Sequence, residues 1–296
     1  MKNNSAKLVK LNNELNVAIL PIEYWINELE NNKTFSFVKA NHGIFDTMLR
    51  TRKNINPNNL KLKDLPLHMF NCRHKNNKLV SQETYCEIIK SMLRNTYSYD
   101  KSPENFYVGI SNSNGIWTVE STPRNIFINK ICKNSKRSFL HGGLIRRYSI
   151  SGEIFKLFDY LNSNNFNVNV IGADYCSNYN RFFKNMNHIK IPIRNALNDI
   201  DLIIDKAKNQ IKDKEKNIFF VTLTTGSFYF CEKMQTENCT VIDIGRAFDW
   251  LIQDIDYAKS QPWIKKDILK KGNHLTNKIK KYDNLLIEIN KTTNNY

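Results

Sequence analysis

The chain has 296 residues, a length that fits one large domain or two small ones. Hydrophobic residues make up 41% and aromatic residues 11% of it, which supports a buried core and excludes wholesale disorder. Lys and Arg number 44 against 28 Asp and Glu. The resulting net charge of +16 favours a polyanion, an anionic membrane surface or a phosphate-bearing substrate, and does not choose among them.

Two further patterns bear on where the protein works. No apolar run approaches the roughly 18 residues that cross a bilayer, and the N-terminus lacks the apolar stretch of a secretory signal. The six cysteines are irregularly spaced and form no CxxC pair, which argues against a zinc ribbon or a disulfide framework. We therefore expect a cytoplasmic protein with reduced thiols, peripheral to a membrane at most and not secreted.

Strands and helices are predicted in alternation from Thr34 to Asp254. Residues 1–16 are polar and are expected to be frayed or weakly helical. Ser81 and Pro123 occupy positions typical of helix starts. The predicted helices are 21–29, 43–52, 82–94, 123–132, 151–161, 199–207, 226–234 and 247–254. The predicted strands are 34–40, 106–110, 139–145, 167–171, 189–193, 217–223 and 240–244.

This alternation predicts an α/β fold with a Rossmann-like, mostly parallel sheet flanked by helices. The nearly continuous apolar run of 217–223 indicates a strand buried on both faces. No Pro- or Gly-rich linker divides the core, so we expect a polar segment (1–16), one α/β domain (17–258) and a basic tail (259–296). Gly272 is expected to divide that tail into two helices.

Ligands of open α/β sheets bind beyond the carboxyl ends of the strands. Polar residues follow most of the predicted strands, and they include the candidate site residues His42, Asp46, Arg146, Arg147, Asp174, Asn195, Thr224, Thr225, Gly226, Ser227 and Arg246. Thr224–Ser227 precedes a predicted helix and could cradle a phosphate, or simply cap that helix. It lacks the Lys-[Ser/Thr] of a P-loop, and no GxGxxG, GxSxG or HExxH pattern is present.

The order of these pieces resembles the GT-D type glycosyltransferases, a family first described as a domain of unknown function. Its members carry, in order, a Phe-x-x-Val-Arg strand with a Gly-Asp-Gly-Glu turn, a Val-Gly-Ile-Pro strand, an Ile-Ser-Arg-Pro-Tyr segment, a strand ending in Glu-Gly-Glu, an Ile-x-x-Pro-x-x-Asn-Ala-Phe segment, a Leu-Gly-Pro-Thr-Ala turn and Asp-Ile-Gly-His. The counterparts are Phe35–Lys39 with Asn41–Gly43, Val108–Ser111, Leu144–Tyr148, Ile171–Asp174, Ile189–Leu197, Leu223–Gly226 and Val241–Arg246. They cover about residues 35–250, and the case depends on their order.

The resemblance implies transfer of a hexosyl group from a nucleoside-diphosphate sugar to an acceptor hydroxyl. It implies a diphosphate held by Arg146, Arg147 and Thr224–Ser227, with Asn195 and Asp243 near the nucleotide. The acceptor would be a glycan, a lipid-linked molecule or a protein. The basic tail is expected to be a solvated helical face, or a contact with a membrane-bound or anionic acceptor.

The chain departs from the family where a divalent metal would bind. The family's Asp-x-Glu falls on His42-Gly43-Ile44, and neither carboxylate is present. His42 and Asp46 lie four residues apart, so on a helix they could hold Mn²⁺ or Mg²⁺ together. Alternatively, Lys39, Arg146, Arg147 and Arg246 neutralise the departing diphosphate without a metal. The general base is then expected among His42, Asp46 and Asp174.

Two other functions stay open. A catalytically silent member of the family, acting as a scaffold, is compatible with the loss of Asp-x-Glu. A nucleic-acid-binding protein is compatible with the charge, but the lysines are dispersed and no known RNA- or DNA-binding module is present, which makes nucleic acid the less favoured partner.

Overall fold

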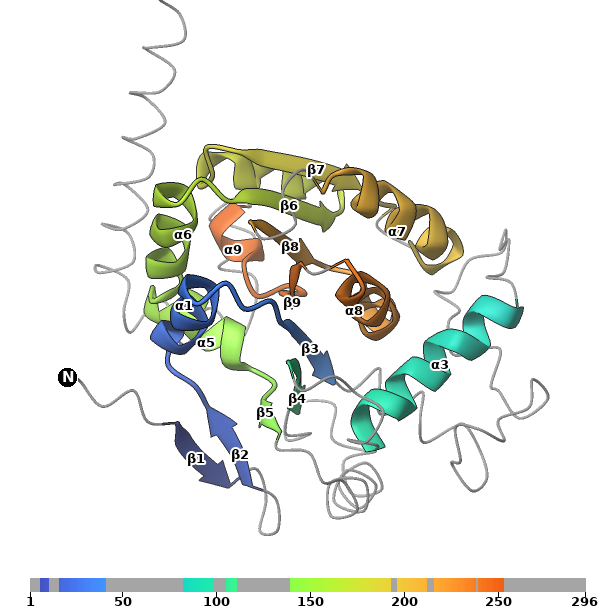
Figure 1. The fold of residues 1–296 in the computed structure, drawn as a ribbon, viewed down its shortest axis with the longest axis horizontal. Helices are drawn as coiled ribbons and strands as arrows, with labels where there is room; N and C mark the ends of the chain where they lie inside the picture. Colours follow the sequence, from blue (N-terminus) through green and yellow to red (C-terminus); the bar gives the residue numbers. More distant parts are fainter. Residues whose placement is uncertain are drawn as a thin grey trace, which may run out of the picture.

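One sheet between two layers of helices organises the protein (Figure 1). The computed structural model describes residues 6–10, 16–40, 82–97, 105–110, 139–192, 196–211, 216–237 and 239–252. Over these residues the sheet has nine strands in the order β1-β2-β5-β4-β3-β9-β8-β6-β7. β1 pairs with β2 in antiparallel fashion, and the other pairs are parallel. The predicted fold class, α/β with a mostly parallel sheet flanked by helices, is confirmed.

The strands are β1 (Lys7–Lys10), β2 (Asn16–Ile19), β3 (Ser36–Ala40), β4 (Phe106–Ile110), β5 (Leu140–His141), β6 (Asn167–Gly172), β7 (Met186–Lys190), β8 (Asn217–Val221) and β9 (Thr240–Asp243). The helices are α1 (Ile22–Glu30), α3 (Gln82–Tyr97), α5 (Leu144–Ser151), α6 (Ile154–Ser163), α7 (Ile200–Asn209), α8 (Ser227–Gln235) and α9 (Asp249–Ile252). Short 3-10 helices are η6 (Asp174–Arg181), η7 (Ala196–Asp199) and η8 (Thr224–Gly226).

The two helical layers pack on separate apolar cores. Helices α3, α7 and α8 cover one face of the sheet, while α1, α5, α6 and α9 cover the other (Figure 1). Strand β8 lies between β9 and β6, and all five of its residues are buried. Phe219 faces the first core and Phe220 the second, because successive side chains of a strand point to opposite faces. This confirms the expectation that the strand is buried on both sides.

The N-terminal segment differs from its prediction. Residues 7–10 form β1 rather than a frayed or weakly helical stretch, and they pair with β2 in the register Lys7↔Ile19. The polar composition gave no sign of this strand, because its hydrogen bonds come from a partner strand and not from local spacing.

The predicted strand at 139–145 is largely wrong. Only Leu140–His141 is a strand, and Gly142 and Gly143 turn the chain into α5. Leu144, Ile145 and Tyr148 are buried at the spacing of one helix face, and this helical period accounts for the apolar run better than a strand does. Arg146 and Arg147 therefore lie in a helix and do not follow a strand directly.

Two boundaries also shift. The helix predicted at 151–161 begins at Ile154, because Gly152 takes the left-handed φ of 75° and ends α5. The extended piece predicted at 189–193 is β7, which starts earlier, at Met186, and ends at Lys190. β7 is an edge strand and carries polar side chains near its start, so the apolar pattern of the sequence does not mark where it begins.

Several predictions lie outside the described residues. These are the helices at 43–52 and 123–132, the basic tail 259–296, and the site residues His42, Asp46 and Asn195. Within the described residues, none of the helices combines the length and the apolar character that crossing a membrane requires. Cys176, Cys231 and Cys239 are buried free thiols.

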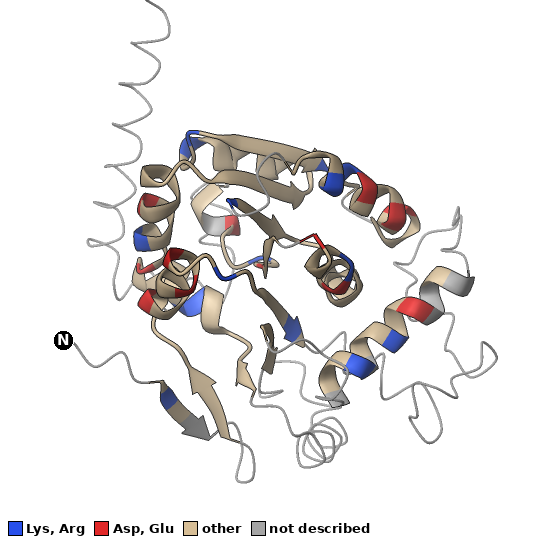
Figure 2. Cartoon of the chain, in the orientation of Figure 1, with Lys and Arg blue, Asp and Glu red and all other residues tan. Residues whose placement is uncertain are grey.

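Charges in the described residues are of both signs. Helices α3, α7 and α8 each carry Lys or Arg together with Asp or Glu, so basic and acidic residues are interspersed along them (Figure 2). The net charge of the chain therefore does not translate into a purely basic stripe on these three helices.

Candidate functional site

A buried pair of opposite charges joins the ends of β3 and β9. The backbone N–H of Lys39 donates to Asp243 Oδ2 at 3.2 Å, and the Lys39 ammonium lies 4.0 Å from Asp243 Oδ1. The Lys39 side chain is 16% exposed and that of Asp243 is 4% exposed. Both residues lie where these parallel strands reach their carboxyl ends, the edge at which α/β sheets bind ligands.

Gly245 leaves room for this pair. Its φ is +47°, a left-handed conformation that favours glycine. A Cβ at this position would overlap the Lys39 ammonium. The Gly245 N–H also donates to Asp243 Oδ1 at 3.0 Å. Glycine at 245 is therefore favoured both by the turn after β9 and by the present position of the Lys39 ammonium.

A second pair of charges follows within one helical turn. Arg246 Nε donates to Asp249 Oδ2 at 2.7 Å, and the Tyr175 hydroxyl donates to the same carboxyl group. The Asp249 side chain is 2% exposed, whereas that of Arg246 is 63% exposed. A buried carboxylate thus holds a largely exposed guanidinium at the edge of the sheet.

Arg146 approaches the same place from α5. The Ser149 hydroxyl, three residues later on this helix, donates to the carbonyl of Ala247 at 2.8 Å and so fixes α5 against the segment after β9. Arg146 is half-buried, and its positive charge is near enough to lower the pKa of Lys39. We name Lys39, Arg146, Asp243, Arg246 and Asp249 the carboxyl-edge cluster.

Burial dominates the protonation of this cluster. It raises the pKa of Asp243, against the opposing effects of Lys39 and of two backbone N–H groups. It lowers the pKa of Lys39, against the attraction of Asp243 and Asp249. It also raises the pKa of Asp249, which Arg246 opposes. Lys39, Asp243 and Asp249 are therefore desolvated, and their mutual interactions are stronger than they would be in water.

The turn Thr224–Ser227 borders the cluster but exposes only its first half. Thr224 is exposed, Thr225 half-buried, and Gly226 and Ser227 buried. A Cβ on Gly226 would lie 2.5 Å from Leu197 Cδ2, so helix packing accounts for this glycine. The buried Ser227 hydroxyl lowers the pKa of Asp243, although it makes no hydrogen bond of normal geometry.

Thr224 carries the clearest backbone strain of this edge. Its φ is +51°, unfavourable for a β-branched residue, and the preceding Leu223 has φ −98° and ψ 13°. A right-handed residue followed by a left-handed one is the backbone pattern of an anion-binding nest. The backbone at Leu223 and Thr224 is therefore compatible with the predicted phosphate contact, which stays a prediction, and Gly226 and Ser227 are buried.

Asp174 lies at the carboxyl end of the neighbouring strand β6. Its side chain is 73% exposed and forms an ion pair with the Lys190 ammonium at 2.8 Å. This interaction lowers the pKa of the Asp174 carboxyl group. Asp174 directly precedes Tyr175, the partner of Asp249. Arg147 points elsewhere: it is exposed, and its charge lowers the pKa of His141 at the end of β5. The adjacent arginines thus do not act as one clamp.

The described donors do not fit a divalent cation. In the described ranges no three His, Cys, Asp or Glu side chains come together as metal ligands. The buried carboxylates of this edge, Asp243 and Asp249, already face Lys39 and Arg246. The predicted metal ligands His42 and Asp46 lie outside the described residues.

Sequence reasoning missed two members of this site. Asp249 follows Arg246 by three residues, a spacing that brings charges together on one helical turn, so this signal was available. Tyr175 gave no such signal, because only the packing of η6 against α9 brings it to Asp249. Lys39, Arg146, Asp243 and Arg246 were predicted, and the fold does bring these four together.

The comparisons with known proteins find matches among solved structures and none among sequence families or curated proteins. No protein-family model matches the chain, and no curated protein matches it. Two solved structures of domain of unknown function 1792, one described as having a distinct glycosyltransferase fold, align with TM-scores of 0.47 and 14% identity over 79% of this chain and 81% of theirs. A structure described as a new glycosyltransferase from Streptococcus sanguinis aligns with a TM-score of 0.47 and 11% identity, over 79% of this chain and 84% of that one.

Proposed function

We propose that the protein is a glycosyltransferase that moves a sugar from a nucleoside-diphosphate donor to an acceptor hydroxyl. The observation that carries this proposal is the convergence of Lys39, Arg146 and Arg246 at the carboxyl ends of β3 and β9. Three cations from separate elements, two of them held by buried carboxylates, suit a ligand with two adjacent phosphates. The motif order that resembles the GT-D glycosyltransferases also supports it.

The reaction makes two demands that these residues could meet. The bond between the anomeric carbon and the diphosphate oxygen breaks, so negative charge develops on the leaving diphosphate. Preorganised cations in a desolvated site stabilise such charge strongly. The acceptor oxygen forms the new bond and loses its proton to a base. Among the described residues, Asp174 is our candidate for this base.

The other partners follow from the same proposal. Thr224 and Thr225 would contribute main-chain N–H groups to the diphosphate, and Asn195 would lie near the nucleotide. The acceptor would be a glycan, a lipid-linked molecule or a protein, with the basic tail 259–296 in contact with an anionic acceptor or membrane.

Thermal unfolding against UDP-, GDP- and TDP-sugars and the free diphosphates tests the donor site. A ligand at 100 times its Kd stabilises the native state by about 2.7 kcal/mol, which shifts Tm by several degrees. We expect a shift with one nucleotide series, with or without Mn²⁺. The Arg246→Gln variant should lose it, whereas Lys156→Gln, which breaks only the surface pair with Glu23, should keep it.

Turnover separates the active enzyme from a silent scaffold. Release of nucleoside diphosphate in the presence of the donor that shifts Tm is the expected result. A clear shift without any release over hours, for the donor alone and with glycan acceptors, would favour the scaffold. The absence of a shift with every nucleotide would contradict the donor site itself.

A further inference from the structure

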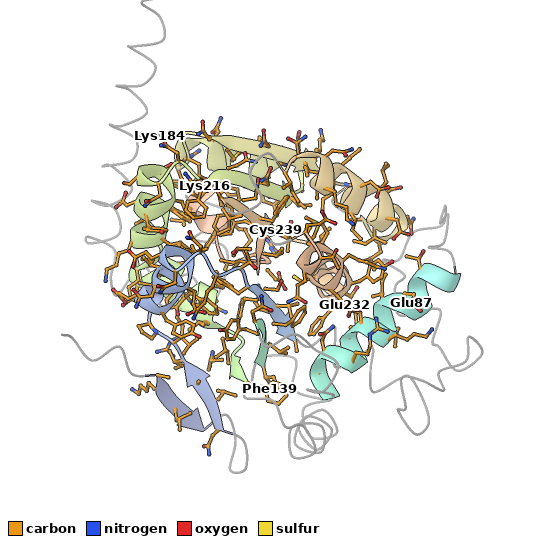
Figure 3. The ribbon with its side chains drawn as sticks, viewed as in Figure 1. Glu87, Phe139, Lys184, Lys216, Glu232 and Cys239 are labelled. Atoms are coloured by element: carbon orange, nitrogen blue, oxygen red, sulfur yellow. The ribbon has the colours of Figure 1, made fainter. Side chains whose placement is uncertain are left out.

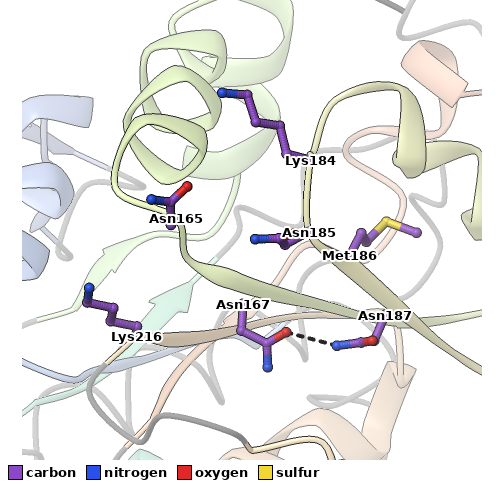
Figure 4. Close-up of a pocket in the computed structure, with 7 residues that line it drawn as sticks. All are labelled: Asn165, Asn167, Lys184, Asn185, Met186, Asn187 and Lys216. Carbon is purple, nitrogen blue, oxygen red and sulfur yellow. Dashed lines mark hydrogen bonds between the residues drawn. The ribbon is translucent and has the colours of Figure 1, made fainter. Parts of the chain in front are cut away.

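A polar hollow lies at the amino-terminal edge of the sheet, opposite the carboxyl-edge cluster. Its volume is about 450 Å³, within the usual range for small-ligand sites. Asn167 and Met186 line it near the starts of β6 and β7, as shown in Figure 4. Parallel strands keep their two ends apart, so this hollow is separate from the proposed donor site.

Amide side chains form the floor of the hollow. The Asn187 amide donates to Asn167 Oδ1 at 2.9 Å (Figure 4) and to Asn169 Oδ1 at 3.1 Å. The Asn167 amide in turn donates to Asn217 Oδ1 at 2.6 Å and to the carbonyl of Gln210 at 2.9 Å. The amides thus form one hydrogen-bonded row across β7, β6 and β8.

The row is costly for a purely structural feature. Asparagine is disfavoured inside strands. Asn169 and Asn217 are fully buried, and the Asn217 amide nitrogen makes no hydrogen bond. A buried donor without a partner is destabilising, while apolar residues at these positions would avoid that cost. The fixed row does, however, hold the Asn167 and Asn187 amides in one orientation at the hollow.

The rim adds groups that no part of the described protein engages. The side chains of Asn165 and Asn185 are exposed, and neither makes a hydrogen bond within the described ranges. Lys184 and Lys216 line the border of the same hollow and extend outward on different sides of it (Figure 4). Both are exposed and form no ion pair with any described residue. Among the described residues that line the hollow, none is acidic. Its chemistry is therefore that of neutral amides together with two cations.

We propose that this hollow binds an acidic glycan, with sugar hydroxyls on the free amides of Asn165 and Asn185 and sugar carboxylates on Lys184 and Lys216. A free primary amide offers a donor and an acceptor side by side, as neighbouring sugar hydroxyls require, whereas both N–H groups of Asn167 and of Asn187 are already used within the row. Single-stranded nucleic acid is disfavoured, because its bases stack on aromatic side chains and the described lining of this hollow contains none. This site is independent of the proposed function, since its recognition uses none of the carboxyl-edge residues.

Binding of a fluorescent tetragalacturonate, measured by anisotropy on the full chain, tests the proposal. A neutral galactose tetramer, tripolyphosphate and oligo-dT serve as competitors. We expect the Lys184→Gln/Lys216→Gln double variant to weaken binding roughly tenfold, as the loss of two exposed charge contacts implies. Asn185→Ala should weaken it by about threefold. Lys206→Gln, an exposed lysine on α7, should change it less than about twofold.

The outcomes separate this site from simple charge attraction. Tetragalacturonate should compete best, and the Arg246→Gln variant should bind it normally even if the donor site fails every test. Absence of saturable binding would overturn the proposal. So would an equal loss in Lys206→Gln, or displacement by tripolyphosphate or oligo-dT at concentrations below those of unlabelled tetragalacturonate, which would indicate anion or nucleic-acid binding instead.

Discussion

Lys39 and Asp243 are 204 residues apart in the chain and meet twice, through the Lys39 backbone N–H at 3.2 Å and through its ammonium at 4.0 Å. The first interaction ties β3 to β9 and the second balances two desolvated charges. Because strand position fixes both, the pair is part of the sheet as well as part of the candidate site. Replacement of Lys39 should therefore change both the free energy of unfolding and its dependence on pH.

Lys39→Met should leave the Asp243 carboxylate buried without its cation. Removal of one partner of a buried pair costs about 3–5 kcal/mol. We expect a loss of about 2–4 kcal/mol in the free energy of unfolding, because Lys39 retains some exposure and the ion-pair distance is long. Urea unfolding at pH 7 measures this, and the Lys39→Met/Asp243→Asn variant should recover part of the loss.

The same variant should show a distinct pH dependence. Burial already raises the pKa of Asp243, and removal of Lys39 should raise it further. A carboxyl group with a folded pKa above its unfolded value binds more protons when folded, so its contribution to stability falls as pH rises from about 4 through the folded pKa. The deficit of Lys39→Met should therefore be smaller at pH 4 than at pH 7. A deficit that is constant with pH, or unchanged by the second substitution Asp243→Asn, would contradict this assignment.

Gly245→Ala should affect both stability and ligand binding. A left-handed φ costs an L-residue about 1–2 kcal/mol, and here the methyl group also displaces the Lys39 ammonium. Gly152→Ala is the matched control, since Gly152 is left-handed as well but ends α5. Both variants should lose stability in thermal unfolding, and only Gly245→Ala should lose the nucleotide-dependent shift. Equal retention of that shift would separate Gly245 from the donor site.

Asp249→Asn should loosen Arg246 without changing the size of the buried side chain. Asp249 does not reach the surface, so it is a positioning residue that acts through Arg246 and Tyr175. We expect donor KM to rise roughly tenfold with a smaller change in kcat, because an exposed arginine loses its anchor. Arg246→Gln should raise KM similarly, and the double variant should add little. Additive losses would show that Asp249 acts separately from Arg246.

Glu232→Ala should detach α3 from α8. Glu232 accepts hydrogen bonds from Ser91 at 2.6 Å, Asn95 at 2.6 Å and Arg94 at 2.5 Å, and it lies between the two helices in Figure 3. Ser91 and Asn95 are buried, so the loss of their acceptor should cost about 2–3 kcal/mol. Glu237→Ala, which breaks the pair with Lys208, should cost less than about 1 kcal/mol.

Chemical denaturation compares these two variants directly. Donor binding by the folded fraction of Glu232→Ala should stay normal, since this network lies away from the carboxyl-edge cluster. A loss of binding that exceeds the unfolded fraction would indicate that α3 itself supports the donor site.

The sequence alone determined the class of fold and much of the candidate site. Apolar runs and their spacing located β3, β4, β6, β8 and β9, because burial on one or both faces imposes a period that local sequence must carry. The rule that ligands bind at the carboxyl ends of strands then selected Arg146 and Arg246. The order of motifs supplied the glycosyltransferase resemblance, and Lys39 and Asp243 came from it.

Tertiary structure alone decided the remaining features. β1 depends on hydrogen bonds from β2. The extent of α5 depends on whether its apolar residues pack in the core with the spacing of a helix or with that of a strand. The separation of Arg146 from Arg147 follows from that helix, since adjacent helical residues point in different directions. Tyr175 meets Asp249, and amides from three strands meet in one row, only because the sheet brings distant segments together. Pairing across the sheet is a long-range property that no local pattern encodes.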